Sequence, residues 1–305
     1  MRLLNASGCL DALAAPEVAR SFDAFVTKTV TPRPREGNAP ARIAEADAGM
    51  LNAIGLANPG LERFLVDHLP RLAQLGIPIW VSVGGFSSSD YEAMCGAIDE
   101  RDEVAVVEVN LSCPNVDEVP GNVGEVVARA REATDKPLYA KLSPAVPDIG
   151  ELARAAAAAG ADGLSLVNTI RGLALDERSL RPVLARGTGG LSGPALRPVA
   201  LAAVYACHRA TGLPIVGMGG VASGRDALEL LAAGASDVAV GTALFADPGA
   251  AGRIRAELAV ELAARGFASP DNVVGASHRG DSATLDQESR VPSKKRLHIK
   301  ANMAG

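Results

Sequence analysis

The stretch Val104-Ala-Val-Val-Glu-Val-Asn-Leu111 is an apolar, valine-rich run that ends in the polar sequence Ser112-Cys-Pro-Asn115. A run of this kind, closed by a proline turn, is typical of a strand that is covered on both faces of a parallel sheet. Seven similar runs occur elsewhere in the chain, at residues 3–6, 24–30, 78–83, 137–142, 163–167, 214–218 and 237–240. The sequence therefore predicts eight parallel strands.

Helical patterns alternate with these strands, at residues 61–75, 89–100, 123–134, 148–159, 195–211, 225–233 and 248–264. Strands that alternate with helices of about ten or more residues predict βαβ units. Eight units in roughly 250 residues are the number in a closed barrel rather than an open sheet. We expect an α/β fold, a single-domain (β/α)8 TIM barrel over residues 1–267 with a short N-terminus.

Segments without clear periodicity complete the expected organisation. Residues 168–194 are rich in glycine and arginine, so we expect a long loop on the active face of the barrel. Gly160-Ala-Asp162 and Gly234-Ala-Ser236 each follow a predicted helix, where a glycine can adopt positive φ and cap the helix. Residues 268–305 are expected to form a polar, disordered tail.

Composition excludes several classes of protein. The chain has 305 residues, of which 48% are hydrophobic, and this excludes an intrinsically disordered chain. Its 30 basic and 35 acidic residues give no electrostatic footprint for nucleic acid. There is neither an apolar run of about 18 residues for a membrane span nor a secretory leader, so we expect a cytoplasmic protein. The four cysteines lie far apart, which argues against disulfides and a metal site: Cys9, Cys95, Cys113 and Cys207.

Polar residues and glycines gather at the C-terminal ends of the predicted strands. Each one alone could be a turn or capping residue, but a barrel brings them to one mouth. They are Ser7, Lys28, Thr29, Ser82, Asn110, Cys113, Lys141, Asn168, Thr169, Gly219, Gly220, Gly241 and Thr242.

Two features of this mouth indicate an anionic ligand. Glycines after strands seven and eight, in Met218-Gly-Gly-Val221 and Val240-Gly-Thr242, let backbone amides approach a phosphate. Lys28 and Lys141 require an electron-rich or anionic partner if they point into the mouth. The alternative for each lysine is an exposed side chain that extends to solvent.

Cys113 differs from the other cysteines in its neighbours, because Asn110 and Asn115 bracket it with amides that can bind a planar polar ring. A thiol has an ordinary pKa of about 8.5, so it can act as a general base near neutral pH. The alternative is a buried, inert cysteine, which is what we expect for Cys9, Cys95 and Cys207.

Taken together, seven segments resemble class 1 dihydroorotate dehydrogenase over residues 2–267. They are Phe25-Val-Thr-Lys-Thr29, Gly49-Met-Leu-Asn-Ala-Ile-Gly-Leu56 with Asn58-Pro-Gly60, Asn110-Leu-Ser-Cys-Pro-Asn115, Tyr139-Ala-Lys-Leu-Ser143, Leu166-Val-Asn-Thr169, Gly189-Gly-Leu-Ser-Gly-Pro194 and Gly217-Met-Gly-Gly220. The Asn-Ala-Ile-Gly-Leu version is most similar to the class 1B catalytic subunit.

The resemblance implies an FMN-dependent oxidation of (S)-dihydroorotate to orotate in de novo pyrimidine synthesis. Cys113 would remove a proton from C5 as hydride leaves C6 for the flavin. The FMN would be surrounded by Ser7, Lys28, Thr29, Ser82, Asn110, Lys141, Val167 and Gly193, with its phosphate on Gly219, Gly220, Gly241 and Thr242. Dihydroorotate would be held by Lys28, Asn52, Ala53, Ile54, Gly55, Leu56, Asn110, Asn115, Asn168 and Thr169.

The class 1B resemblance also implies partners. Electrons would pass to NAD through a second subunit that carries FAD and a 2Fe-2S cluster, and the chain would form a homodimer or a heterotetramer with that subunit. The alternatives are a fumarate-coupled class 1A activity, an activity like that of dihydropyrimidine dehydrogenase, and a catalytically impaired flavin-binding barrel.

Three departures from the family pattern bear on activity. The chain begins almost directly at the first strand, where relatives carry a further stretch. Ser82 stands where many relatives have an asparagine. The segment 116–124 after the cysteine is shorter than usual, which would impair closure over Cys113.

Overall fold

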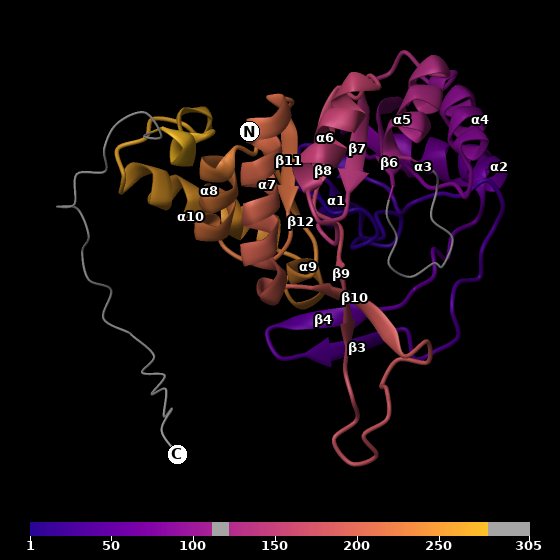
Figure 1. Ribbon diagram of the computed structural model, residues 1–305, viewed down its shortest axis with the longest axis horizontal. Helices are drawn as coiled ribbons and strands as arrows, with labels where there is room; N and C mark the ends of the chain where they lie inside the picture. The colour runs from indigo at the N-terminus through magenta and orange to yellow at the C-terminus, as the bar shows by residue number, and fades with distance from the viewer. Residues whose placement is uncertain (112–121, 280–305) are drawn as a thin grey trace.

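The protein is described by a computed structural model that covers residues 1–111 and 122–279. Eight parallel strands form one sheet in the order β1-β12-β11-β8-β7-β6-β5-β2, and a parallel bridge from Leu4 to Ala24 joins its two edge strands. The expected TIM barrel is confirmed (Figure 1). Its strands are β1 (Leu3–Asn5), β2 (Phe25–Val26), β5 (Ile79–Val83), β6 (Val104–Asn110), β7 (Leu138–Leu142), β8 (Gly163–Leu166), β11 (Ile215–Met218) and β12 (Asp237–Val240).

Helices cover the outer face of the barrel at the predicted places, and several of their ends are capped. Ser87 begins one helix with a capping box, in which its hydroxyl accepts from the Asp90 amide and its amide donates to the Asp90 carboxylate. Gly234 ends another helix in the left-handed conformation. The helices are α1 (Pro16–Ala19), α2 (Leu61–Arg63), α3 (Leu69–Ala73), α4 (Ser88–Asp99), α5 (Val123–Glu132), α6 (Ile149–Ala158), α7 (Arg197–Thr211), α8 (Gly224–Ala233), α9 (Ala243–Ala246) and α10 (Ala250–Ala263).

Alternate residues of each barrel strand face the helices or the barrel interior. The helix-facing residues belong to one large apolar core with the helices. The interior is filled by a second cluster, in which the rings of Trp80 and Tyr139 lie 4.7 Å apart and the Arg2 guanidinium lies 5.2 Å above the Trp80 ring. The N-terminal end of the barrel interior is therefore a packed core, and the cavities described below lie at the opposite end.

A second sheet lies across the open end of the barrel, and the sequence did not predict it (Figure 1). It is antiparallel, in the order β3-β4-β10-β9. The expectation of a loop at residues 168–194 is wrong, because this segment supplies two of its strands. The four strands are β3 (Ile43–Ala46), β4 (Gly49–Asn52), β9 (Ile170–Leu173) and β10 (Thr188–Ser192).

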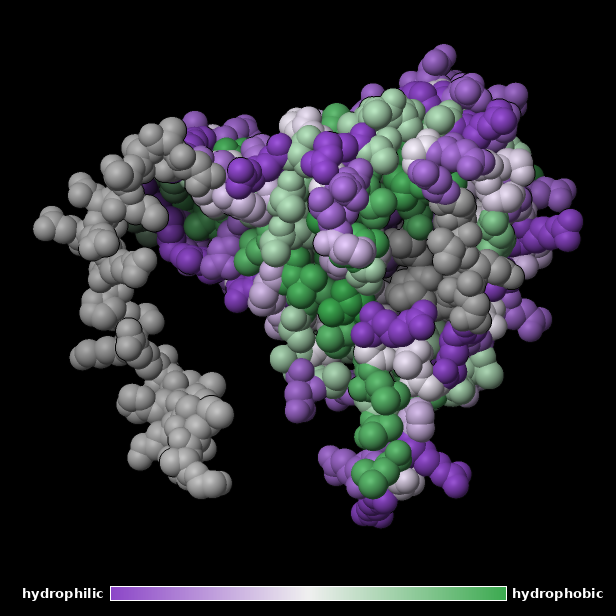
Figure 2. All heavy atoms as spheres, viewed as in Figure 1, coloured by the Kyte–Doolittle hydropathy of each residue, from purple (hydrophilic) through white to green (hydrophobic). Residues whose placement is uncertain are grey.

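The hairpin between β9 and β10 projects away from the barrel and carries exposed apolar side chains, which form the green patch on the lower projection in Figure 2. Leu180 at its tip is 70% exposed. The second sheet therefore has one side that closes over the barrel and a hairpin that extends beyond it.

Residues 268–279, which we expected in a disordered tail, pack against the barrel. They form two 3₁₀ turns, Pro270–Asn272 and Ala276–His278, and Val273 between them is buried. The Ser277 hydroxyl donates to the Ala232 carbonyl at 2.8 Å, and the Gly275 amide donates to the Leu231 carbonyl at 3.0 Å. The barrel domain thus includes this segment, and the rest of the expected tail, 280–305, lies outside the described residues.

None of the helices within the described ranges combines the length and apolar character that a membrane crossing requires.

Candidate active site

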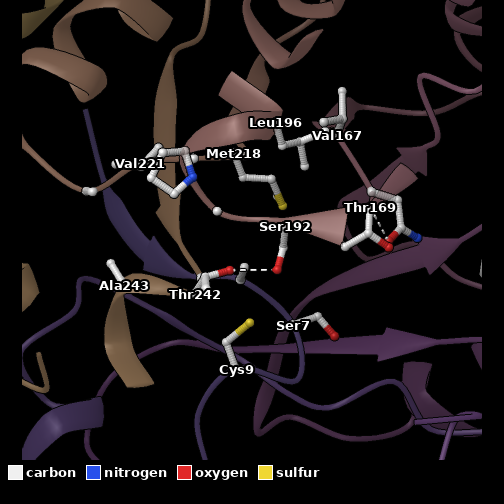
Figure 3. Close-up of a pocket in the computed structure, with 18 of the residues that line it drawn as sticks. Ser7, Cys9, Val167, Thr169, Ser192, Leu196, Met218, Val221, Thr242 and Ala243 are labelled. Atoms are coloured by element: carbon white, nitrogen blue, oxygen red, sulfur yellow. Dashed lines mark hydrogen bonds between the residues drawn. The ribbon is translucent and has the colours of Figure 1, made fainter. Parts of the chain in front are cut away.

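Two adjoining cavities open at the C-terminal ends of the barrel strands. One, here called the barrel cavity, has a volume of about 360 Å³ and lies over β8, β11 and β12. The other, here called the sheet cavity, has a volume of about 270 Å³ and lies between the barrel mouth and β4. Residues shared by both cavities make them one continuous site: Ser7, Cys9, Lys141, Asn168, Thr169 and Ser192. Figure 3 shows Ser7, Cys9, Thr169 and Ser192 around the common opening.

Glycines form one wall of the barrel cavity. Gly219 and Gly220 follow β11 with φ of +117° and +76°, a region that strains other residues. A Cβ on Gly220 would also lie 2.8 Å from the Cβ of Arg197. The described backbone hydrogen bonds include none donated by the amides of Gly219, Gly220, Gly241 or Thr242. These amides are therefore available to an anion such as a phosphate.

Two lysines supply positive charge to the site. Lys28 and Lys141 both line the sheet cavity, so neither side chain simply extends to solvent. Lys141 is buried, and its Nζ lies 3.5 Å from Oε1 of Glu108 on the neighbouring strand. Gly8 leaves space for Lys28, because a Cβ at that position would lie 3.0 Å from the lysine Nζ.

A chain of hydroxyl and amide groups crosses the floor of the site. Thr29 Oγ1 lies 3.0 Å from Ser82 Oγ and accepts a hydrogen bond from Asn110 Nδ2 at 3.1 Å. Asn168 Nδ2 in turn donates to Asn110 Oδ1 at 3.2 Å. The Tyr91 hydroxyl donates to the Asn110 carbonyl at 2.8 Å and fixes the end of β6. The polar groups of β5 and β6 and of the segments after β2 and β8 thus hold one another in place.

Ser82 occupies a different place from the one expected for a cofactor-binding residue. It is fully buried, lines neither cavity, and contacts Thr29, which does line the sheet cavity. Ala53 likewise lines neither cavity, since it is buried in the small core of the second sheet beside Leu51. Neither residue therefore borders the cavities themselves.

The second sheet contributes the residues that close the sheet cavity. Asn52, Ile54, Gly55 and Leu56 line it, as does Met50. Asn52 Nδ2 donates to the Gly190 carbonyl at 3.3 Å, which ties β4 to β10.

A hydrogen-bond path also connects the barrel to this sheet. Thr242 Oγ1 donates to Ser192 Oγ at 2.8 Å, drawn as a dashed line in Figure 3. Ser192 Oγ also lies 3.3 Å from the Met50 carbonyl, which accepts from it. The position of the second sheet over the barrel mouth is therefore fixed by the same residues that border the glycine wall.

Most of the remaining predicted residues line one or both cavities. Val167, Gly193, Gly219, Gly220, Gly241 and Thr242 line the barrel cavity. Lys28, Thr29 and Asn110 line the sheet cavity, while Ser7, Lys141, Asn168 and Thr169 line both. Two predicted residues, Cys113 and Asn115, lie outside the described residues.

Cys9 is the cysteine that the sequence reading placed wrongly. It is partly exposed and lines both cavities, whereas Cys95 and Cys207 are buried as expected. Burial raises the pKa of Cys9, and the nearby ammonium groups of Lys141 and Lys28 only partly oppose this shift. Burial raises the pKa of Cys95 and of Cys207 to about 12. All three thiols are therefore protonated near neutral pH.

Four further residues line one or both cavities and were not predicted from the sequence: Ser192, Met50, Met218 and Phe245. The signal for Ser192 was present, because it adjoins Gly193 in the segment Gly189-Gly-Leu-Ser-Gly-Pro194. Met218 ends β11 and shares the interior-facing alternation of Val216. Within the described residues, no group of three or more histidine, cysteine or acidic side chains could hold a metal ion.

Comparison with known proteins gives one family. A family model described as dihydroorotate dehydrogenase matches residues 2–262. A relative named dihydroorotate dehydrogenase B (NAD(+)), catalytic subunit, from Desulforudis audaxviator is 48% identical over 263 residues, which cover 84% of this chain and 86% of the relative. The protein of the same name from Geobacillus kaustophilus is 42% identical over 287 residues, covering 90% and 91% of the two chains.

Solved structures support the fold. Ligand-free DHODH from Eimeria tenella superposes with a TM-score of 0.77 at 23% identity, covering 90% of this chain and 88% of that one. The same organism's DHODH in complex with ferulenol gives a TM-score of 0.75 at 24% identity, covering 91% and 85% of the chains.

Proposed function

The chain belongs to the dihydroorotate dehydrogenase family, and from this premise we propose how its site works: FMN occupies the joined cavities, and dihydroorotate binds between the flavin and the second sheet. The reaction is the oxidation of (S)-dihydroorotate to orotate in de novo pyrimidine synthesis. The observation that carries the proposal is the single site formed by the glycine wall, two lysines and a row of amides.

The described residues fit a flavin mononucleotide. The free amides of the glycine wall suit its phosphate. No larger residue fits at Gly219 or Gly220, because a Cβ there would meet Ala200 or Arg197. Ser7, Thr29, Lys141, Val167 and Gly193 border the rest of the joined cavities. Bound FMN supplies the acceptor for a hydride, and the protein's part is to bind, orient and polarise.

The amides of the sheet cavity suit the pyrimidine ring of dihydroorotate. Asn52, Asn110 and Asn168 offer both donors and acceptors, which match the ring carbonyls and N–H groups. Lys28 supplies a cation for the substrate carboxylate. The hydrogen bonds that hold Asn110 and Asn168 fix the directions in which their remaining groups point.

Cys113 is proposed as the base that removes the C5 proton. It follows Asn110, the last residue of β6, by three positions in the sequence. A thiol is suited to this task because its ordinary pKa lies within about two units of neutral pH. Asn115 is proposed to hold the substrate beside it.

The electron acceptor is proposed to be NAD, reached through a partner subunit. The relatives cited above are named NAD(+)-dependent and catalytic subunits, and a catalytic subunit implies a second one. The proposed partner carries FAD and a 2Fe-2S cluster, which would take electrons from FMN one at a time. We propose that the catalytic chain forms a homodimer within a heterotetramer with this partner.

Stopped-flow bleaching of the flavin on adding dihydroorotate tests the assignment. The wild-type protein is expected to bleach, and Cys113→Ala is expected to bleach about 10²–10⁴-fold more slowly with FMN still bound, the usual contribution of a general base. Cys113→Ser should bleach faster than Cys113→Ala, because its hydroxyl can still accept a proton. It should bleach more slowly than the wild type, because an alcohol is a far weaker acid than a thiol near neutral pH.

Three results would contradict the proposal in different ways. Normal bleaching in Cys113→Ala would remove the proposed base. No bleaching by FMN-loaded wild-type protein would favour a flavin-binding barrel without catalysis. Rapid fumarate reduction by the isolated chain would overturn the NAD-linked assignment.

A further inference from the structure

Glu108 is a buried carboxylate at the base of the site that the proposed mechanism does not use. Its side chain is 2% exposed. It lies on β6 between Val106 of the interior cluster and Asn110 of the site, and alternation on the strand makes all three face the barrel interior. A carboxylate is seldom fully buried unless it is paired.

Lys141 is the partner of Glu108. The two side chains meet at 3.5 Å, from Nζ to Oε1, and among the described residues no other group forms a hydrogen bond or ion pair with Glu108. The lysine ammonium lines both cavities, whereas the carboxylate lies beneath it and lines neither. The negative charge is therefore placed directly behind a cation that faces the ligand.

The geometry does not indicate a pair selected for stability. At the opposite end of the barrel, Arg2 and Asp237 form three hydrogen bonds, at 2.6, 2.8 and 3.3 Å, with the arginine partly in solvent. The pair of Glu108 and Lys141 makes one long contact and is almost completely removed from water. A buried pair of this kind is commonly no more stabilising than apolar residues of similar size.

The surroundings leave the charge of Glu108 poorly screened. On the flanking strands, the residues in register with Glu108 are Ser82, whose hydroxyl is already bonded to Thr29, and Tyr139. One strand further, Ser165 is in register with Lys141. Ser165 Oγ is buried and has no hydrogen-bond partner within the described residues. Below lie Trp80, Val106 and Tyr139. Charges in such an apolar interior interact over longer distances than charges in water.

We infer that Glu108 is a positioning residue that holds the Lys141 ammonium at the base of the site and, through its own negative charge, lowers the affinity of the bound flavin for electrons. The inference rests on the proposed function. Reduction adds negative charge to the flavin, so Lys141 favours the reduced form and Glu108 opposes it. The two residues together set the driving force with which electrons enter from the substrate and leave for the next acceptor.

The midpoint potential of bound FMN tests this role. Glu108→Gln keeps the shape of the side chain and removes its charge, so the two-electron equilibrium should shift toward reduced FMN by about tenfold, which is a rise of about 30 mV. The dissociation constant of the flavin–sulfite adduct, which also places negative charge on the ring, should fall by about the same factor. Lys141→Gln should shift both quantities in the opposite direction.

Ser165→Ala is the matched control, because it changes an equally buried neighbour of Lys141 without changing charge. The midpoint potential of its FMN should equal that of the wild type.

If Glu108→Gln does not fold, Glu108→Ala leaves room for water beside Lys141, and the midpoint potential of its FMN should show the same upward shift. A merely structural role for Glu108 would alter thermal stability and leave the potential in place.

The outcomes separate the two proposals. An unchanged or lowered potential in the Glu108 variant, with FMN bound and bleached normally by dihydroorotate in the wild type, overturns this inference alone. A wild-type chain that does not bind FMN overturns the proposed function, and this inference with it.

Discussion

The two sheets of this protein contribute to the site in different ways. The barrel supplies the glycine wall, both lysines and the amides of Asn110 and Asn168, all at strand ends. The antiparallel sheet and the residues that follow β4 supply Asn52, Ile54, Gly55 and Leu56, which close the cavity from above. On the proposed function, the barrel would hold the charged groups of the cofactor, and the second sheet would cover the substrate.

The cores of the two sheets differ in size. Barrel residues belong to a large core shared with the helices and to a filled interior. The second sheet has its own small cluster of four buried residues, Ala44, Leu51, Ala53 and Leu184. Because stability follows the amount of apolar surface that is buried, we expect the second sheet to open locally while the barrel stays folded.

The largest effect is expected at the centre of the barrel interior. Trp80 is 1% exposed and packs on both Tyr139 and Arg2. Trp80→Ala should lower the free energy of unfolding by about 3–5 kcal/mol, since a large cavity cannot collapse inside a closed barrel. Urea unfolding followed by far-UV circular dichroism measures this loss. If Trp80→Ala lowered the free energy of unfolding by less than Leu51→Ala in the second sheet, the barrel would not be the more stable of the two parts.

An intermediate and more local effect is expected from Leu51→Ala, which truncates one of the two leucines, Leu51 and Leu184, in the core of the second sheet. The KM for dihydroorotate should rise by roughly tenfold, equivalent to about 1.4 kcal/mol of binding. The affinity for FMN, which depends on the barrel, should stay the same. Fluorescence titration of FMN and steady-state kinetics measure the two quantities.

Leu180→Ser serves as the control for Leu51→Ala, because Leu180 lies on the hairpin of the same sheet but is exposed. This variant should change the free energy of unfolding by no more than about 0.5 kcal/mol. Equal losses of FMN and of substrate affinity in Leu51→Ala would show that the two sheets act as one unit.

The smallest effect concerns the outer surface of the barrel, where the His278 ring stacks on Tyr205 at 4.1 Å and lies 4.7 Å from His208. Burial, and then the charge of His278, lower the pKa of His208 below its ordinary value of 6.5. The unfolded chain therefore takes up a proton more readily than the folded one. The neutral His208 ring therefore contributes fully to the stability of the folded chain above pH 6.5, and this contribution declines as the pH falls below 6.5.

Hydrogen exchange at residues 270–279 should accordingly be faster at pH 5.5 than at pH 7.5, after correction for the intrinsic pH dependence. Two arginines also lie near these rings: Arg209, whose guanidinium lies 5.9 Å from the Tyr205 ring, and Arg279, which directly follows His278 in the chain. His208→Asn cannot titrate and should remove most of the difference. An equal pH response in that variant would assign the effect to another group.

The sequence predicted the barrel well because its strands are buried on both faces. Runs such as Val104–Asn110 are then apolar almost throughout, and glycines mark the helix ends. The second sheet escaped detection for the opposite reason. The strand Ile43–Ala46 is largely exposed, and Thr188–Ser192 contains two glycines, so neither has the pattern of a buried strand.

Within the site, the sequence identified the residue types at strand ends but not the depth of each. Ser82 and Asn110 both face the barrel interior near the ends of their strands. Of the two, Asn110 reaches the cavity, because its side chain lies one layer nearer the mouth. Cys9 looked like a core cysteine because nothing next to it in the chain marks a site. Its place became evident only from the Lys28 and Lys141 side chains that other strands bring toward it.

The order of residues alone determined the number of parallel strands, their closure into a barrel and the chemical groups at its mouth, since periodicity and turn residues act over short distances along the chain. Tertiary structure decided which of these groups meet. The pairing of β4 with β10 joins segments about 140 positions apart, and the contact between Glu108 and Lys141 depends on strand register. Such contacts are set by packing in three dimensions, which no local pattern encodes.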